Sequence, residues 1–269
     1  MEIKNNFLKN SGVSVELSPN KGDIFQSPPD TIVLHYTAAG SPASAIQTFE
    51  NPSSKASAHL IIGRKGEIIQ MVPFDTIAWH AGASQHENRT GLNKFSIGIE
   101  IDNAGLLEKR GDKYLSWFGR AYPENEVVFA VHRNEFTPKY WHEYTEIQIE
   151  LVEKICYLLM DTFPVKYILG HEEISPGRKI DPGPAFPLEK IRCRILGSKR
   201  DEDGPEIIIG QEMSVMADGL NIRALPDINA EKIAKPLSKN QKVKVIEKKN
   251  GWVKIDTSIT GWVAERYLK

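Results

Sequence analysis

The chain has 269 residues, of which 41% are hydrophobic and 26% charged, and its formal net charge is -1. This composition is typical of a soluble globular protein, and the length allows one well-cored domain plus a smaller one. The sequence has neither an apolar run near the roughly 18 residues of a membrane span nor a dense basic patch interleaved with aromatics, so we expect no membrane and no nucleic acid as partner.

The N-terminus and the cysteines bear on the compartment. Residues 1–6 are polar and lead into no apolar core of the signal-peptide type, so we expect no export by that route. Cys156 and Cys193 cannot form a disulfide framework, which indicates a reducing compartment. Cys156 lies in an apolar helical pattern and is expected to be a buried core thiol.

The first hundred residues predict strands with few helices. Residues 1–30 read as a polar lead-in. Residues 31–36 form an apolar run rich in branched side chains, which predicts a buried strand with His35 near its end. Ser41 and Pro42 are expected to start a helix that runs through Phe49. The segments 57–62 and 67–72 predict a hairpin closed by the glycine-containing turn between them.

The next stretch brings in polar groups and a long excursion. Trp79 and His80 are expected in a loop. Residues 95–101 predict a buried strand in which the carboxylate of Glu100 is costly unless it is paired or functional. Residues 103–144 are aromatic and irregular, and we interpret them as an insertion that lines a binding groove.

A second helix and a rigid loop follow. Thr145 and Gln148 have the spacing of a capping box, and the apolar spacing after them predicts a helix up to Phe163. Residues 167–169 predict a strand, and residues 187–196 a closing helix. Between them the loop 170–184 is rich in glycine and proline, which hold side chains in place without a helix or strand.

The amino-acid composition changes near residue 198. A charged stretch there predicts a linker, so we expect domains at 1–197 and 207–269 joined by residues 198–206. The second domain is mildly basic and contains short alternating segments that predict a small all-β barrel. The first is expected to be α/β, with a mixed central β-sheet flanked by helices.

Four histidines lie on or beside the predicted sheet, namely His35, His59, His80 and His171. A hydrolytic zinc site needs three protein ligands and an open position for water. His35, His171 and Asp181 can supply these ligands, Glu100 a general base and Lys179 an oxyanion stabiliser. Each residue alone is weak evidence, because a sheet with scattered structural polar residues gives the same pattern.

Five ordered motifs add a family resemblance. They are His35-Tyr36-Thr37-Ala38, Ser57-Ala58-His59-Leu60, Trp79-His80-Ala81-Gly82, Ser96-Ile97-Gly98-Ile99-Glu100, and His171 with the segment from Pro176 to Gly183. Residues 30–190 thereby resemble the type 2 zinc-dependent N-acetylmuramoyl-L-alanine amidases, and most closely their AmpD-like subgroup. The resemblance implies zinc on His35, His171 and Asp181, with Glu100 and Lys179 as catalytic residues, and cleavage of the amide between muramic acid and L-alanine.

The resemblance also suggests substrate-binding residues: Tyr36, His59, Trp79, His80 and Arg178. For His59 a structural role is the stronger alternative, whereas His80 is open between the two roles. Some relatives have a catalytic tyrosine where this chain has Ala58, so here Glu100 and Lys179 must carry that role. Some also use a cysteine as third ligand, where this chain has Asp181.

Residues 213–269 resemble a bacterial SH3 domain, in which Trp252 and Trp262 either bind the cell wall or fill a small core. The expected partner is peptidoglycan or a muropeptide, and no obligate protein partner is inferred. A catalytically silent peptidoglycan-binding protein is the alternative function. The expected location is the cytoplasm, or the cell wall after release without a classical signal peptide, and the natural substrate is either polymeric wall or a small anhydro-muropeptide.

Overall fold

The computed structural model describes residues 1–197, 209–215, 219–226, 230–249, 252–257, 260–264 and 268. The chain forms two compact units, residues 1–196 and 197–269. The predicted linker, residues 198–206, lies outside the described residues, so its boundaries stay a prediction. No described helix is long and apolar enough to cross a membrane.

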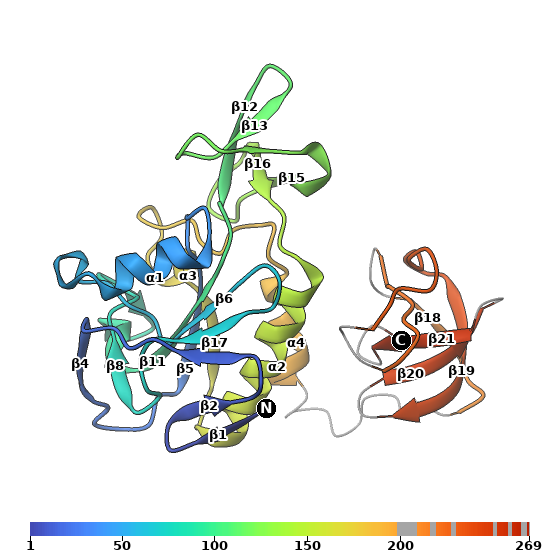
Figure 1. The fold of residues 1–269 in the computed structure, drawn as a ribbon, viewed down its shortest axis with the longest axis horizontal. Coiled ribbons are helices and arrows are strands. Elements are labelled where there is room, and N and C mark those ends of the chain that lie inside the picture. Colours follow the sequence, from blue (N-terminus) through green and yellow to red (C-terminus); the bar gives the residue numbers. More distant parts are fainter. Residues whose placement is uncertain are drawn as a thin grey trace. The chain divides into compact units, whose positions relative to one another are not determined.

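The first unit is built on a six-stranded mixed sheet, which confirms the predicted fold class (Figure 1). Strand β11 runs parallel to β5 and β6, β17 parallel to β5 and β3 parallel to β7, whereas β6 and β7 form the predicted antiparallel hairpin. In spatial order the strands are β17 (Tyr167–Gly170), β5 (Thr31–Tyr36), β11 (Ser96–Ile101), β6 (Leu60–Ile62), β7 (Ile68–Gln70) and β3 (Val13–Val15). Both faces of the central strands are covered, so their sequences are continuous apolar runs rather than alternating ones.

The alternation of side chains along each strand divides the sheet into two faces. Ile32, Leu34, Ile97 and Ile99 point to one face and form the main core with helices α2 (Glu146–Thr162) and α4 (Leu188–Gly197). The neighbouring residues point to the opposite face, where helix α1 (Pro42–Glu50) covers only strands β6 and β7. His35 and Glu100 are register partners on β5 and β11 and lie on this second face, beyond the cover of α1.

The helix starts follow their predicted capping. Ser41 accepts a hydrogen bond from Ser44 N at the start of α1, and Pro42 is its first residue. Thr145 and Gln148 form a reciprocal capping box at the start of α2. A short helix, α3 (His171–Ile174), follows β17 directly within the segment that was expected to be loop.

The N-terminal segment, which the sequence analysis describes only as a polar lead-in, contains four short strands. Strands β1 (Glu2–Lys4) and β2 (Phe7–Lys9) form a hairpin, and Leu8 N donates to Gln70 Oε1 at 2.7 Å. Strand β3 extends the central sheet, and β4 (Lys21–Ile24) pairs with β8 (Thr76–Ala78). Strands of three or four residues are too short to show a clear alternation of polar and apolar side chains, so the sequence pattern misses them.

The insertion is also more regular than predicted. Its five strands form an antiparallel sheet in the order β14-β13-β12-β16-β15, which projects away from the central sheet (Figure 1). The strands are β12 (Leu106–Arg110), β13 (Lys113–Leu115), β14 (Ala121–Tyr122), β15 (Val127–Val131) and β16 (Pro138–His142). The remaining short elements of the first unit are η1 (Pro52–Ser54), β9 (Gln85–His86), β10 (Arg89–Thr90), η2 (Leu92–Lys94) and η3 (Glu124–Glu126).

The second unit is all-β, as predicted. Its antiparallel sheet has the order β18-β19-β20-β21, and the strands are β18 (Glu212–Ser214), β19 (Lys242–Lys249), β20 (Trp252–Asp256) and β21 (Thr260–Ala264). Val253, Ile255 and Val263 point into its core. Trp252 and Trp262 alternate with them, so both lie on the opposite face, although Trp262 is almost buried there. Residues 220–223, predicted as a strand, form only isolated bridges.

Candidate active site

The candidate site lies at the carboxyl edge of the parallel strands, where loops gather in α/β sheets. His35 is near the end of β5, Glu100 is beside it on β11, and His171 is the first residue after β17. Asp181 comes back to the same place through the loop that follows α3. That loop turns at Gly177 and Gly183, whose φ values of 77° and 74° are costly for residues with a side chain.

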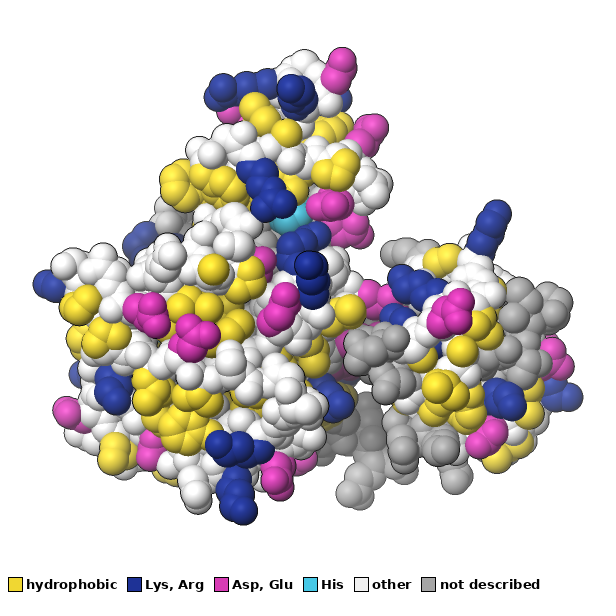
Figure 2. Space-filling model, in the orientation of Figure 1, with side chains coloured by type: hydrophobic (Ala, Val, Ile, Leu, Met, Phe, Trp, Pro, Cys, Tyr) yellow, Lys and Arg dark blue, Asp and Glu magenta, His cyan; other side chains and the backbone are white. Residues whose placement is uncertain are grey.

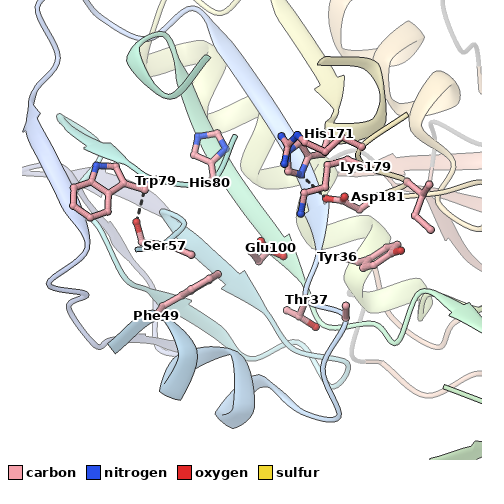
Figure 3. A pocket seen from close by; sticks show the side chains of 14 residues that line it. Tyr36, Thr37, Phe49, Ser57, Trp79, His80, Glu100, His171, Lys179 and Asp181 are labelled. Atoms are coloured by element: carbon pink, nitrogen blue, oxygen red, sulfur yellow. Dashed lines mark hydrogen bonds and ion pairs between the residues drawn. The ribbon is translucent and has the colours of Figure 1, made fainter. Parts of the chain in front are cut away.

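Three of the predicted residues, His35, His171 and Asp181, converge on one point. Figure 3 shows two of them, His171 and Asp181, side by side. His35 Nδ1 is 2.9 Å from His171 Nδ1, and Asp181 Oδ2 is 3.0 Å from each of these two nitrogens. All three side chains are buried. Among the described residues, this is the group whose ligand atoms lie close enough together to hold a metal ion.

The outer hydrogen bond of His171 defines which of its nitrogens carries the proton. His171 Nε2 lies 3.1 Å from Ala81 O, and a carbonyl oxygen can only accept. Arg178 Nη2 lies 3.2 Å from the same nitrogen, but it has closer acceptors at 2.8 Å in Ala81 O, Ala83 O and Ser175 Oγ. His171 Nε2 is therefore the donor, and Nδ1 of the neutral ring is left with a lone pair that faces the cluster.

For His35, two consecutive hydrogen bonds indicate which ring nitrogen carries the proton. His80 Nε2 donates to Ser96 O at 3.3 Å, so Nδ1 of the neutral His80 ring is an acceptor. His35 Nε2 lies 3.0 Å from that atom and must be the donor, which leaves His35 Nδ1 without a proton. Burial lowers the pKa of His35 to about 4 and that of His80 well below its usual value, and neighbouring histidines lower both further, so the rings are neutral near pH 7.

The donor set therefore suits a cation. Two imidazole lone pairs and a carboxylate oxygen at mutual distances of 2.9–3.0 Å repel one another unless positive charge lies between them. Two histidines and one carboxylate, with further ligand positions open to a pocket, form a typical ligand set of a hydrolytic zinc site. The residues present thus fit zinc.

Glu100 lies beside this cluster in the pocket (Figure 3). The side chain is only partly buried, but Oε2 is inaccessible and has no hydrogen-bond partner within the described part of the chain. Burial raises the pKa of Glu100 well above its usual value, the charge of Asp181 adds to this, and the Lys179 ammonium opposes it. Because the residue as a whole is only partly buried and lines the pocket, its carboxyl group can exchange a proton with a bound molecule.

The cluster opens into a cavity of about 370 Å³. The cavity is lined by all but two of the predicted residues of the first unit, and Tyr36, Trp79, His80, Arg178 and Lys179 are among them. His35 does not line the cavity, but it contacts the lining residues His80, His171 and Asp181. The complete lining is Tyr36, Thr37, Ala38, Phe49, Ala56, Ser57, Trp79, His80, Glu100, His171, Arg178, Lys179, Ile180 and Asp181.

His59 is the second residue outside the lining, and it is fully buried. Its Nε2 donates to Thr76 O at 2.9 Å, and its Nδ1 accepts from Gly98 N at 3.0 Å. Both ring nitrogens are thus occupied by the backbone of neighbouring strands. The substrate-binding role predicted for His59 has no support in this geometry, which matches the structural alternative.

Two other groups that hold the site were not predicted from the sequence. Asn93 Oδ1 accepts from His80 N at 3.1 Å and Ala81 N at 2.7 Å, which holds the loop that carries His80. His132 in the insertion donates from Nε2 to Glu172 Oε2 at 2.7 Å, and Gly183 N donates to the same oxygen at 3.1 Å. A histidine and a glutamate 40 positions apart give no sequence pattern, so only the fold reveals this pair.

Comparisons with known proteins agree with this geometry. The family described as N-acetylmuramoyl-L-alanine amidase matches residues 25–184, and the bacterial SH3 domain family matches residues 218–269. The 1,6-anhydro-N-acetylmuramyl-L-alanine amidase AmpD of Escherichia coli K12 is 36% identical over 147 residues, which are 54% of this chain and 60% of the relative. AmiD, an N-acetylmuramoyl-L-alanine amidase of the same organism, is 28% identical over 179 residues, 63% of this chain and 54% of the relative.

A solved structure gives a similar result. The crystal structure of a selenomethionine derivative of AmpD superposes with a TM-score of 0.52 at 25% identity and covers 72% of this chain and 99% of that one. The two curated relatives, by contrast, are matched over little more than half of their own lengths.

Proposed function

Because the chain belongs to the N-acetylmuramoyl-L-alanine amidase family, we propose that it hydrolyses the amide bond between N-acetylmuramic acid and L-alanine in peptidoglycan or muropeptides. The observation that carries this proposal is the convergence of three potential ligand atoms, on His35, His171 and Asp181, next to an open cavity that His171 and Asp181 line.

In this proposal His35, His171 and Asp181 hold zinc. When bound, zinc lowers the pKa of a coordinated water and polarises the carbonyl of the scissile amide. The protein holds the ligands ready through their outer contacts, which are His80 for His35 and Ala81 O for His171. Glu172 N donates to Asp181 O at 2.9 Å, which fixes the backbone of the third ligand.

Glu100 is the proposed general base. Its side chain is partly exposed in the cavity, so the carboxylate can take the proton of the attacking water and return it to the leaving amine of L-alanine. Lys179 also lines the cavity and adds a positive charge that stabilises the oxyanion of the tetrahedral intermediate. In this chain Ala58 is fully buried against helix α1, so no side chain at that position contributes.

Mass spectrometry of the products tests the proposal. The protein is incubated with purified sacculi and with a soluble muropeptide, each with and without a zinc chelator. We expect free stem peptides that begin with L-alanine, and we expect the chelator to stop their release. A zinc-loaded protein that releases no peptide from either substrate would contradict the enzyme assignment and leave the silent peptidoglycan-binding protein as the alternative.

A further inference from the structure

The insertion sheet carries an exposed apolar surface that the proposed chemistry does not use. Trp117, Phe129, Val131 and Phe136 are exposed by 77%, 58%, 46% and 100%, although a soluble protein rarely exposes large aromatic side chains in such a group. Figure 2 shows hydrophobic side chains together with lysine and arginine on the projecting lobe that β12–β16 form. A surface with both apolar and charged side chains is complementary to a ligand that has both apolar and polar faces.

A groove of about 580 Å³ lies on the same sheet, and of these four exposed side chains Trp117 is the one that lines it. Its walls come from β12, from β16 and from the turn after β13, and it is mostly apolar with two lysines at its edge. The lining residues are Leu106, Leu107, Glu108, Lys109, Leu115, Ser116, Trp117, Pro138, Lys139 and Tyr140. We call it the Trp117 groove.

Trp117 joins this groove to the catalytic cavity. Its indole Nε1 donates to Ala38 O at 2.8 Å, and Ala38 is itself a lining residue of the cavity. Three residues later, Arg120 Nη1 donates to Gly40 O at 2.8 Å, so the turn after β13 is tied at two points to the loop that follows β5. A lining residue of the groove is thus hydrogen-bonded to a lining residue of the cavity, so the two hollows are neighbours and a ligand too long for the cavity can reach the groove.

The ring of Trp117 is held for stacking. Its ring stands at 90° to Phe118 with a centroid distance of 5.6 Å, and its N–H already has an acceptor, so the indole is fixed while most of its surface stays exposed. A preoriented aromatic face loses little conformational entropy when an apolar face of a ligand covers it.

We propose that the Trp117 groove binds the glycan strand of peptidoglycan, next to the muramic acid whose amide is cleaved. This inference rests on the proposed function, because the same polymer that carries the scissile amide must leave the catalytic cavity along its sugar chain. The glycan is an uncharged backbone of rings with an apolar face and polar edges, which fits an aromatic wall with lysine side chains at its rim. A stem peptide carries several charged carboxylates and fits a mostly apolar groove less well.

The test compares Trp117→Ala with the unchanged full-length protein on two substrates. One is an N-acetylmuramoyl peptide with a single sugar, which is too short to reach the groove, and the other is purified sacculi. Loss of one stacking aromatic face corresponds to about a tenfold loss in binding. We therefore expect kcat/KM on sacculi to fall about tenfold, mainly through KM, while kcat/KM on the single-sugar substrate stays the same.

Two further variants distinguish stacking of the Trp117 ring on a ligand from its hydrogen bond to Ala38 O. Trp117→Phe keeps an aromatic ring but loses the hydrogen bond to Ala38 O, so it should retain most of the activity on sacculi. Phe136→Ala removes an exposed aromatic side chain that lines neither hollow, and it should behave like the unchanged protein. A pull-down of zinc-free protein on peptide-free glycan strands should show weaker binding for Trp117→Ala than for Phe136→Ala.

The outcomes are distinct from a failure of the proposed function. If the unchanged protein cleaves neither substrate, the amidase proposal fails. If it cleaves both and Trp117→Ala loses activity equally on both, Trp117 shapes the catalytic cavity or binds the peptide, and the glycan proposal is overturned. Equal binding of Trp117→Ala and Phe136→Ala to glycan strands would overturn it as well.

Discussion

Replacing His80 by alanine is expected to weaken zinc binding although His80 is not a proposed ligand. The substitution removes the acceptor of His35 Nε2, which lies 3.0 Å from His80 Nδ1 in a buried position. Either that N–H stays unpaired, at a cost of about 1–3 kcal/mol, or the proton moves to Nδ1 and blocks the lone pair that faces the metal. Removal of such an outer partner typically lowers metal affinity about 10- to 100-fold, or about 1.4–2.7 kcal/mol.

The affinity is measured by competition with a chromophoric zinc chelator on purified protein. His59→Ala is the matched control, because His59 is equally buried and its ring centroid lies 6.0 Å from that of His80, yet neither of its nitrogens bonds a ligand. We expect the control to lose stability but to keep its zinc affinity. If folded His80→Ala protein binds zinc as tightly as the unchanged protein, the hydrogen bonds that link Ser96, His80 and His35 do not influence zinc affinity.

Gly98→Ala tests the same reasoning without removing any polar atom. Gly98 lies directly under the His80 ring, and an added Cβ would clash with that ring. We expect the ring to be displaced and zinc affinity to fall as in His80→Ala. Unchanged affinity, in a variant whose circular dichroism is normal, would show that the exact placement of His80 is unimportant.

Three more outcomes follow from the structure. Glu100→Ala should keep its zinc and lose about 10²- to 10⁴-fold in turnover, and metal analysis that finds zinc lost would put Glu100 among the ligands instead. Deletion of residues 207–269 should leave hydrolysis of a soluble muropeptide nearly unchanged and weaken action on sacculi, and equal loss in both assays would contradict a role as anchor. Burial lowers the pKa of His59 from 6.5 to about 4, despite its hydrogen bond to Thr76 O. Between pH 4 and pH 6.5 the unfolded chain therefore binds more protons at this residue than the folded chain does. The free energy of unfolding accordingly falls as the pH falls from 6.5 to about 4. In urea unfolding, His59→Gln should reduce this pH dependence by up to about 3 kcal/mol, and an unchanged dependence would rule out a neutral buried His59.

The central sheet could be predicted because its strands are buried on both faces. Each then carries a run of branched apolar residues that does not depend on the rest of the fold, as β5 and β11 show. The capping residues of α1 and α2 were equally local signals. The N-terminal strands escaped prediction because they have only three or four residues, and β3 and β4 also pair with distant strands. Val13, for example, pairs with Ile68, and nothing near either residue indicates the other. The strands of the insertion are short as well, with two to five residues each.

In the candidate site, too, some features could be predicted from the sequence and others could not. His35 and Glu100 stand out in the sequence because a polar group inside an apolar strand needs a reason. His171, Lys179 and Asp181 stand out because they lie in one turn-rich loop. The structure places these three and Glu100 in the lining of one cavity, and His35 is in contact with His171 and Asp181. The contacts of His80 with His35 and of His132 with Glu172 join residues 45 and 40 positions apart, so their geometry had to come from the folded chain.

The insertion enters and leaves the first unit at almost the same place. His142 N donates to Gly105 O at 2.9 Å, Ala104 N donates to His142 Nδ1 at 3.1 Å, and Leu106 pairs with Trp141. Because the two ends of the insertion are hydrogen-bonded to each other, the insertion can be lengthened, shortened or exchanged without altering the register of β5, β11 and β17. Substrate reach and catalytic chemistry are thereby separable traits of this scaffold. An exchanged lobe would have to reproduce the contacts that support the site, among them those of Trp117 with Ala38, Arg120 with Gly40 and His132 with Glu172.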